Sequence, residues 1–347
     1  MKKKVLMTTV HPAPYMDMWF YKIKEEYDLT VLYNHSRDSA KTWKNFVGYD
    51  GIILDNIPLY KMFAFVYKAD LTIWGGYSSP HLLFGIILSW LLRKKTAIFT
   101  DHPFHQNIIA DIFKKIFLYR IIDYVFCATE VTQTFIENKY RSVTKGKTRF
   151  FPYAVDIPSS VNIITNNNDN IQILVANNFI PRKGYSVLFE ALSHLNDYDR
   201  IRENYHFIIL GHGIEENKYK ELAKKLCIDI KFYGWMEPQE YKRMMDKVDV
   251  YIHPSIEEPF GIPPIDAMGK GKVVIVSDGV KSTERIIRNG ENGYVYPAND
   301  ANELIKILLS LDKSKFNRIK ENAHEDSKKY YSLNQNMNTI RDVFKDY

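Results

Sequence analysis

The stretch EEPFGIPPIDAM at residues 257–268 is the part of the sequence that most restricts the fold. It follows the apolar run VDVYIHPS at residues 248–255, which is typical of a buried strand, so Glu258 is expected in the loop that leaves the carboxyl end of that strand. Pro263 and Pro264 suit the first turn of a helix, because the N–H that proline lacks has no partner there. The segment therefore predicts a strand, a short loop and the beginning of a helix.

The beginning of this predicted helix is a candidate ligand site. Free N–H groups around Gly261 and Ile262 can receive a phosphate or sugar oxygen, and the glycine lets a ligand approach the backbone closely. Two carboxylates flank the position: Glu258 in the loop and Asp266, which we expect in the first helical turn. One could accept hydrogen bonds from sugar hydroxyls and the other from a ribose diol. Alternatively, Asp266 complements the helix dipole and Glu258 is solvated. The residues alone leave both interpretations open.

Short apolar runs alternate with helical patterns along all 347 residues. Strands are expected at KVLMTT, DLTVLY, GIIL, DLTIW, TAIFT and YVFCA in the first half and at IQILVA, HFIIL, IKFYG, VYIHP, VVIVS and GYVY in the second. Buried strands separated by helices predict parallel sheets with right-handed crossovers, which is an α/β fold.

The chain is longer than one hydrophobic core usually requires, so we expect two Rossmann-like domains that face a central cleft. The polar segment 158–170 is typical of a linker between them. We therefore place one domain at residues 1–160 and the other at residues 161–330. Residues 331–347 are expected to form a C-terminal helix, and its return to the first domain is left open.

Composition and charge exclude several classes of protein. A net charge of +6 is too small to indicate nucleic acid as a partner. Cys127 and Cys227 lie too far apart for a disulfide framework or a cysteine-based zinc site, and they suit a reducing compartment. No apolar run approaches the roughly 20 residues of a bilayer-spanning helix, and the N-terminal apolar stretch is too short for a signal peptide. We therefore expect a cytoplasmic protein.

Two clusters of basic residues lie next to apolar segments. The first cluster, Arg93, Lys94 and Lys95, follows the apolar segment LLFGIILSWLL. The second cluster, Lys114, Lys115 and Arg120, lies within the segment IFKKIFLYR. Such clusters can dock a protein on the inner face of a membrane as a peripheral contact. The alternative is a buried helix with a solvated end, which is common in globular domains.

The segment at 257–268 resembles the signature of family 4 glycosyltransferases (glycosyl transferases group 1), in which two glutamates lie eight positions apart around a Phe-Gly pair. Further segments are similar to that family's blocks in the same order: ILVANNFIPRKGYSVLFEAL to its phosphate-binding strand, loop and helix, FIILGHGIEENKYKELAKKL to the following unit, and GKVVIVSDGVKSTERIIRNGENGYVYPANDANELIKILLSL to its closing segment. The resemblance implies the GT-B fold, with an acceptor-binding first domain and a nucleotide-sugar-binding second domain.

The resemblance also assigns roles to residues of the second domain. It implies that Glu258 contacts the donor sugar and that Asp266 contacts the ribose. It implies that Lys183 neutralises the leaving diphosphate, an electrostatic role that contributes strongly to many enzyme rates. Arg182 is expected to assist Lys183 or to be solvated. The other donor-binding candidates that the resemblance implies are Asn178, Gly211, Gly234, Trp235, Met236, Phe260, Gly261 and Ile262.

Two of these positions depart from the family pattern. Asn178 stands where the family usually has an arginine for the diphosphate, which leaves Arg182 or another residue to compensate. Asp266 is one methylene shorter than the usual glutamate, which alters the reach of the ribose contact. Both departures keep open a family member that binds nucleotide without catalysis.

The first domain offers a third catalytic candidate beside Glu258 and Lys183. The segment DHPF at 101–104 follows the predicted strand TAIFT, which places Asp101 and His102 at the edge of the cleft. The resemblance implies that His102 contacts the donor sugar near the reacting carbon, where histidine suits proton handling near neutral pH. A packed or strand-capping histidine is the alternative.

The acceptor side and the question of a metal rest on fewer residues. His11, Tyr15 and Asp101 are candidates for the acceptor side of the cleft. His102 and His105 have a spacing that metal ligands also use, but Pro103 intervenes and no third ligand is evident, so no metal is expected. No other cofactor is implied, because the nucleoside-diphosphate sugar is a substrate.

The implied reaction transfers a hexosyl or related sugar from a nucleoside-diphosphate sugar to an acceptor hydroxyl, with retention at the anomeric carbon and without a metal. The expected acceptor is a glycan or a lipid-linked glycan of cell-surface polysaccharide biosynthesis. A catalytically silent subunit that binds nucleotide and a sugar-nucleotide epimerase of the same fold are the alternatives. A dinucleotide-dependent oxidoreductase is disfavoured, because no G-x-G-x-x-G follows the first predicted strand.

Overall fold

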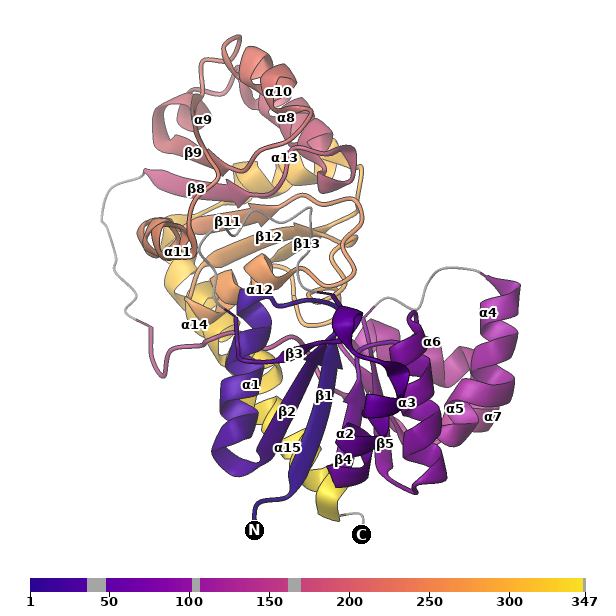
Figure 1. Cartoon of the computed structure of the whole chain (residues 1–347). Coiled ribbons are helices and arrows are strands. Elements are labelled where there is room, and N and C mark those ends of the chain that lie inside the picture. Colours follow the sequence, from indigo (N-terminus) through magenta and orange to yellow (C-terminus); the bar gives the residue numbers. More distant parts are fainter. Residues whose placement is uncertain (36–47, 102–106, 162–169, 346–347) are drawn as a thin grey trace. The chain divides into compact units, whose positions relative to one another are not determined.

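The computed structural model describes residues 1–35, 48–101, 107–161 and 170–345. The chain divides into two compact units, of which unit 1 comprises residues 1–154 and 333–347 and unit 2 comprises residues 155–332 (Figure 1). Each unit is a parallel β-sheet with helices on both faces, so the predicted α/β fold class is confirmed. No helix among the described residues is long and apolar enough to cross a membrane.

Unit 1 contains a seven-stranded parallel sheet in the order β3-β2-β1-β4-β5-β6-β7. Its strands are β1 (Lys4–Thr9), β2 (Asp28–Tyr33), β3 (Ile52–Ile53), β4 (Leu71–Trp74), β5 (Lys95–Thr100), β6 (Tyr124–Cys127) and β7 (Thr148–Phe150). The β7 strand is not among the strands expected from the sequence, because it is a three-residue strand at the edge of the sheet, followed directly by Phe151 and Pro152.

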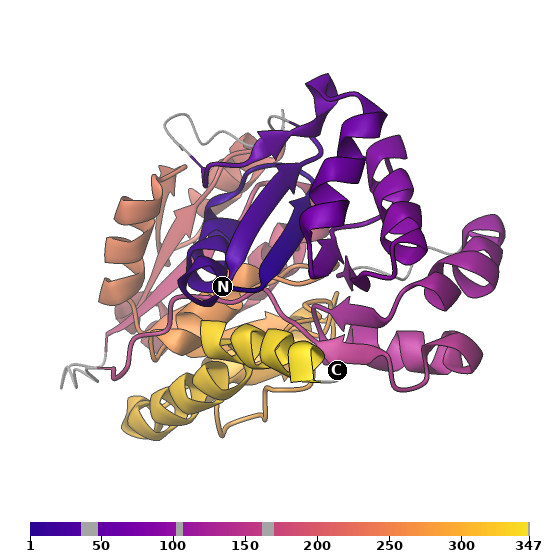
Figure 2. The same cartoon turned by 60° about the horizontal axis from the view of Figure 1, so that its bottom comes forward.

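Helices cover both faces of this sheet. The helical segments are α1 (Pro14–Glu26), η1 (Leu54–Asn56), η2 (Leu59–Lys61), α2 (Met62–Lys68), α3 (Pro80–Leu91), α4 (Ile108–Phe113), η3 (Lys114–Leu118), α5 (Tyr119–Ile121), α6 (Glu130–Lys139), α7 (Arg141–Thr144) and α15 (Leu333–Lys345). The α1 and α15 helices pack on one face (Figure 2), where Met337, Ile340 and Val343 of α15 enter the core. The α2, α3 and α6 helices and the η3 segment pack on the other face.

Unit 2 contains a six-stranded parallel sheet in the order β10-β9-β8-β11-β12-β13. Its strands are β8 (Ile171–Ala176), β9 (Tyr205–Leu210), β10 (Asp229–Gly234), β11 (Val250–His253), β12 (Val273–Ser277) and β13 (Tyr294–Tyr296). Its helical segments are η4 (Pro181–Lys183), α8 (Tyr185–Leu195), α9 (Asp199–Asn204), α10 (Glu216–Ala223), α11 (Pro238–Lys247), α12 (Ile262–Gly269), α13 (Ala301–Ser310) and α14 (Lys313–Tyr331).

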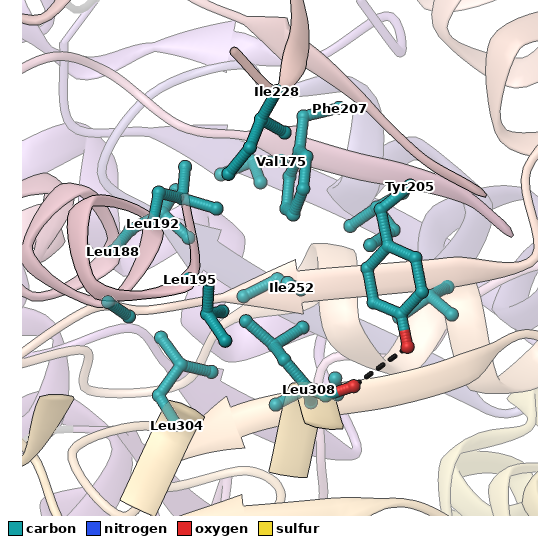
Figure 3. Close-up of a cluster of buried hydrophobic side chains, with 14 of the residues drawn as sticks. Val175, Leu188, Leu192, Leu195, Tyr205, Phe207, Ile228, Ile252, Leu304 and Leu308 are labelled. Atoms are coloured by element: carbon teal, nitrogen blue, oxygen red, sulfur yellow. Dashed lines mark hydrogen bonds between the residues drawn. The ribbon is translucent and has the colours of Figure 1, made fainter. Parts of the chain in front are cut away.

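The core of unit 2 joins α8 and α13 to the sheet (Figure 3). Leu188, Leu192 and Leu195 follow the spacing of one helical face and are fully buried, as that pattern predicts. Tyr205 is also buried, and its hydroxyl donates a hydrogen bond of 2.8 Å to the Leu308 carbonyl. The phenol is therefore satisfied in the interior and ties β9 to α13.

Both sheets have the doubly wound strand order 3-2-1-4-5-6, with a seventh strand added at the edge in unit 1. In this order the connections leave the sheet in opposite directions from two neighbouring central strands. Those strands are β1 and β4 in unit 1 and β8 and β11 in unit 2. Ligands of such sheets bind in the crevice outside the carboxyl ends of these two strands.

Candidate active site

In unit 2, the loops that leave β8 and β11 are held together by their backbones. Gly184, directly after η4, has φ +71°, and a Cβ atom there would lie 1.8 Å from the Pro254 carbonyl oxygen. Only glycine permits both this left-handed conformation and this approach. The Arg182 carbonyl also accepts a hydrogen bond of 2.8 Å from the Ile256 N–H. The side chains of η4 are therefore brought against the loop after β11.

The result is an ion pair between Lys183 Nζ and Glu258 Oε2, two residues that the sequence predicts to be catalytic. Both side chains are largely buried, with 11% of Lys183 and 15% of Glu258 exposed. Arg182 lies at the edge of the pair, with Nη1 3.7 Å from Glu258 Oε2, and it donates a hydrogen bond of 3.2 Å to the Glu257 carbonyl. Two cations thus converge on one carboxylate.

The backbone of Glu258 is fixed independently of its side chain. Its N–H donates to the Gly279 carbonyl at 3.0 Å, and its carbonyl accepts from the Lys281 N–H at 3.1 Å. These bonds form an isolated parallel bridge between Glu258 and Val280. The carboxylate is therefore supported by a second loop, the one that follows β12.

A buried histidine, His253, stands next to the ion pair at the carboxyl end of β11. Its Nδ1 lies 3.3 Å from Asn177 Nδ2 and 3.1 Å from the Tyr251 hydroxyl. An amide nitrogen only donates, so Nδ1 accepts, and the proton of the neutral ring is on Nε2. That nitrogen lies 3.7 Å from Glu258 Oε2. Burial lowers the pKa of His253, which keeps the ring neutral.

The charge state of Glu258 follows from these neighbours. Burial on its own raises the pKa of Glu258, but the approach of His253 and the charge of Lys183 together outweigh burial and hold the pKa at about 2. Burial lowers the pKa of Lys183, and Glu258 opposes that shift. The site therefore contains a permanent carboxylate that can accept hydrogen bonds from hydroxyl groups.

The α12 helix begins as expected at Gly261, which has φ +90°, and Ile262 is the first helical residue. Pro263 and Pro264 follow in the first turn and carry no N–H. The amide donors at the beginning of this helix are thus reduced to Gly261, Ile262 and the residues after the prolines. A Cβ at position 261 would lie 3.3 Å from Glu258 Cγ, so the backbone at the beginning of the helix lies close to the Glu258 side chain.

The expected position of Asp266 in the first turn is wrong. Asp266 is the fifth residue of α12, so it does not complement the amides of the first turn. Its carboxylate instead pairs with Lys270 Nζ at 2.8 Å, one turn further along the helix. Burial raises the pKa of Asp266, and Lys270 opposes that shift. Lys270 has the i, i+4 spacing of a helical ion pair, which is the signal in the sequence that could have revealed this partner.

Other donor-site candidates lie at the carboxyl ends of β9 and β10. Gly211 has φ +126°, and a Cβ there would lie 1.9 Å from the Asn177 carbonyl, so β9 and the β8 loop approach closely. The Gly211 N–H donates to the Gly234 carbonyl at 2.7 Å. The Trp235 N–H donates to His212 Nε2 at 3.3 Å. The backbone at Trp235, a predicted donor-binding position, therefore contacts His212, which is not among the residues predicted from the sequence.

The remaining donor-site candidates differ in exposure. Asn178 is exposed in the loop after β8, whereas Met236 is half-buried after β10. Phe260 is 4% exposed, and its ring packs edge-on against Tyr331 with centroids 5.9 Å apart. The aromatic side chain of Phe260 is therefore part of the interior, where it can position the backbone of the loop.

In unit 1, the candidates divide between described and undescribed residues. His102 and His105 lie outside the described residues. Asp101, at the end of β5, accepts a hydrogen bond of 2.9 Å from the Tyr153 hydroxyl. The Tyr153 ring meets the ring of Tyr15 edge-on, with centroids 5.6 Å apart. Two acceptor-side candidates are thus joined through a tyrosine that no motif in the sequence identifies.

The third acceptor-side candidate, His11, follows the end of β1 and is half-buried, with its carbonyl accepting a hydrogen bond of 3.4 Å from Thr9 Oγ1. It lies at the carboxyl end of one of the two central strands of unit 1. In the described parts of both units, no group of three or more His, Cys, Asp or Glu residues could hold a metal ion.

Unit 2 is a doubly wound α/β unit with buried charges at the point where its strand order reverses, the arrangement of a domain that binds a ligand there. Residues 156–326 match the family described as Glycosyl transferases group 1. The matched residues, which lie in unit 2, belong to this family of glycosyltransferases, and the chain's two parallel-sheet units have the GT-B fold.

Individual relatives support this assignment. Over 133 residues the chain is 35% identical to a phosphatidyl-myo-inositol mannosyltransferase of Mycobacterium leprae. The aligned region covers 38% of this chain and only 34% of that protein. It is 24% identical to an uncharacterized 41.2 kDa protein in the cps region of Klebsiella pneumoniae, over 74% of this chain and 72% of that protein. The similarity to the mannosyltransferase is thus confined to about a third of that protein.

Solved structures show that the fold extends over both units. The structure of Anabaena HepE in complex with UDP superposes with a TM-score of 0.75 at 19% identity, covering 99% of this chain and 100% of that chain. The lipopolysaccharide outer core galactosyltransferase WaaB in its apo form also gives a TM-score of 0.75, at 15% identity, over 99% of this chain and 100% of that chain. At these identities the likeness establishes the fold.

Proposed function

We propose that this protein is a metal-independent, retaining glycosyltransferase that moves a sugar from a nucleoside-diphosphate sugar to an acceptor hydroxyl. The observation that carries the proposal is the buried cluster of Lys183, Glu258 and His253 at the reversal point of the unit 2 sheet. A lysine and a permanent carboxylate in one desolvated place can meet the two parts of such a donor, its charged diphosphate and its neutral sugar.

Binding of the donor changes which groups in this cluster pair with each other. Lys183 Nζ leaves the carboxylate for the diphosphate, whose charge grows as the bond to the anomeric carbon breaks. Glu258 then accepts hydrogen bonds from sugar hydroxyls, with its ionised state held by the remaining neighbours. Arg182, at the exposed edge of the pair, supplies a second cation and compensates for Asn178. The two cations thereby face the two negative charges of the diphosphate.

The rest of the donor is assigned to the neighbouring strand ends. Asp266 receives the ribose hydroxyls, which requires its carboxylate to share Lys270 with the ligand. The backbone at Gly234, Trp235 and Met236 receives the base, and the amides of Gly261 and Ile262 receive donor oxygens. Anabaena HepE, which shares the fold, has been solved in complex with UDP and with UDP-glucose, so a uridine nucleotide is the first donor to test.

The acceptor is assigned to unit 1. We place His102 at the reacting carbon, and Asp101, Tyr15 and His11 on the acceptor side. We propose a glycan or a lipid-linked glycan as acceptor, because relatives are described as acting in lipopolysaccharide core biosynthesis and as a mannosyltransferase of phosphatidyl-myo-inositol. The free cysteines Cys127 and Cys227 agree with a cytoplasmic location, where thiols stay reduced.

A thermal-shift series with UDP, GDP, ADP and their sugars tests the donor site. One nucleotide should raise the Tm, and the corresponding sugar nucleotide should lose its sugar slowly to water or quickly to an acceptor. The Glu258→Gln variant should still bind the nucleotide but transfer sugar far more slowly. Absence of stabilisation by every nucleotide would contradict the proposal. Nucleotide binding with no turnover of any donor would instead favour the catalytically silent subunit.

A further inference from the structure

The outer surface of α2 and α3 in unit 1 carries large apolar side chains that are not buried. The two helices pack against each other on one face of the sheet. On the outer side of these helices and of η2, which directly precedes α2, Tyr60 is 71% exposed, Phe63 49%, Tyr67 62%, Trp90 51% and Leu91 61%. Single exposed apolar residues are ordinary, but a contiguous group of this size marks a docking surface.

These residues form one surface because a lysine joins the two helices. The rings of Phe63 and Tyr67 are stacked, with centroids 5.7 Å apart. Lys94, in the turn after α3, places Nζ 5.6 Å from the centroid of the Tyr67 ring and donates a hydrogen bond of 2.7 Å to the Tyr67 carbonyl. Trp90 and Leu91 end the helix just before this lysine. We call the five apolar residues, together with Lys61, Lys68, Arg93 and Lys94, the α2–α3 surface.

The charged residues of the α2–α3 surface are all basic. The sequence contains no Asp or Glu at residues 57–69 or 79–99, whereas Lys61, Lys68 and Arg93 are exposed among the apolar side chains. The surface is therefore complementary to an anionic partner. Lysine is depleted in the cores of protein–protein interfaces, so this mixture of aromatic rings and lysines fits a lipid surface better than a protein.

A cavity opens at the end of this surface, beyond the C-terminus of α3. Its volume is about 710 Å³, and its lining combines the α3 end and the following turn with the segment around β6: Trp90, Leu91, Arg93, Lys94, Lys95, Ile121, Asp123 and Tyr124. The acidic member, Asp123, accepts a hydrogen bond of 2.9 Å from the Thr96 N–H, which occupies part of its carboxylate. Arg93, another lining residue, is exposed and has φ +52°.

We propose that the α2–α3 surface docks on a bilayer of anionic phospholipid. Tyr60, Phe63, Tyr67 and Trp90 enter the boundary between headgroups and acyl chains, where tyrosine and tryptophan place an apolar ring and a polar tip. Arg93 and Lys94 meet headgroup phosphates at the mouth of the cavity, and Lys61 and Lys68 add attraction to the anionic surface. This contact does not depend on the donor site of unit 2.

Sedimentation with lipid vesicles tests the proposal on the full chain. The protein should sediment with vesicles of equal parts phosphatidylcholine and phosphatidylglycerol, and stay in solution with phosphatidylcholine alone. Added salt should weaken the binding, because exposed charges are screened. Lys61→Glu with Lys68→Glu should lower the partition coefficient by on the order of tenfold or more. Tyr60→Ser with Phe63→Ser should lower it independently of salt.

A matched control uses unit 2, which carries Lys224, Lys225 and the exposed Tyr198. The triple variant Lys224→Glu, Lys225→Glu, Tyr198→Ser makes changes of the same kinds and should bind vesicles like the unaltered protein. The Tm and the UDP-induced Tm shift of each variant separate loss of docking from misfolding and from failure of the donor-site proposal. Equal binding to neutral vesicles, no binding to anionic ones, or equal loss in the control would each overturn the proposal.

Discussion

His253 Nε2 lies 3.7 Å from Glu258 Oε2, inside a site where the histidine is 1% exposed. The other ring nitrogen is occupied by Asn177 Nδ2 and the Tyr251 hydroxyl, so the ring cannot turn without losing both contacts. The histidine therefore presents its N–H to the carboxylate in a fixed direction. In the proposed reaction it would act on the donor sugar only through Glu258, which makes it a positioning residue.

Replacement of His253 by phenylalanine tests this role. The variant keeps the ring but removes the N–H, so the pKa of Glu258 should rise from about 2. The acidic limb of the pH profile of kcat/KM should move to higher pH, and transfer should slow by up to about 100-fold as the carboxylate loses its orientation. His324→Phe is the matched control, because His324 is also buried in unit 2 with an unpartnered Nε2. An unmoved acidic limb in His253→Phe would refute the positioning role.

Lys183→Met should weaken binding of the diphosphate without unfolding the protein. Methionine keeps most of the apolar stem but removes the charge, so turnover should fall on the order of a hundred- to a thousandfold, the typical loss for one preorganised electrostatic contact. The Kd for the nucleotide should rise as well, which isothermal titration calorimetry measures. Lys306→Met, at an exposed ion pair of unit 2, should change neither quantity. Turnover retained in Lys183→Met would move the phosphate role elsewhere.

The local patterns predict the fold of unit 2 well because most of its strands are runs of apolar residues bounded by polar turns. VVIVS and VYIHP, for example, coincide with β12 and β11 apart from one terminal proline. The edge strand β7 cannot be predicted from a local pattern, because three residues followed by Phe151 and Pro152 show no periodicity. Its place is set by pairing with β6, a long-range contact.

The candidate site shows the same division between local and long-range information. The pairing of Lys183 with Glu258 follows from the strand order, which brings the ends of β8 and β11 together. The first-turn assignment of Asp266 is wrong because Gly261 and Ile262 precede the prolines, which moves Asp266 into the second turn. His253 is visible in VYIHP as a histidine at a strand end. Only its tertiary contacts with Asn177 reveal the direction of its N–H.

The stability of the protein should depend on the ionised state of Glu258 at low pH. The pKa of this group is lower in the folded chain than in the unfolded chain, so its contribution is present above the unfolded pKa and is lost as pH falls toward about 2. The loss should be on the order of 3 kcal/mol between pH values of about 5 and 2. Urea unfolding across this range should show a smaller change for Glu258→Gln. Parallel curves for the two proteins would contradict the low pKa.

Gly184→Ala should unfold more easily than a substitution at a positive-φ glycine of unit 2 whose added Cβ meets no neighbour. The new Cβ would meet the Pro254 carbonyl oxygen at 1.8 Å, in addition to the cost of a positive φ for alanine. The loops after β8 and β11 must then separate, which also pulls Lys183 away from Glu258.

Gly290→Ala is the control that carries only the cost of a positive φ for alanine. Gly290 has φ +75°, and nothing lies within 4 Å of its added Cβ, so no steric clash is added. This control should lose about 1 kcal/mol of unfolding free energy, whereas Gly184→Ala should lose about 3 kcal/mol or more. Nucleotide binding should weaken only in Gly184→Ala, because only there does the strain act on the ion pair. Equal losses in the two variants would show that the close approach of the two loops does not hold the site together.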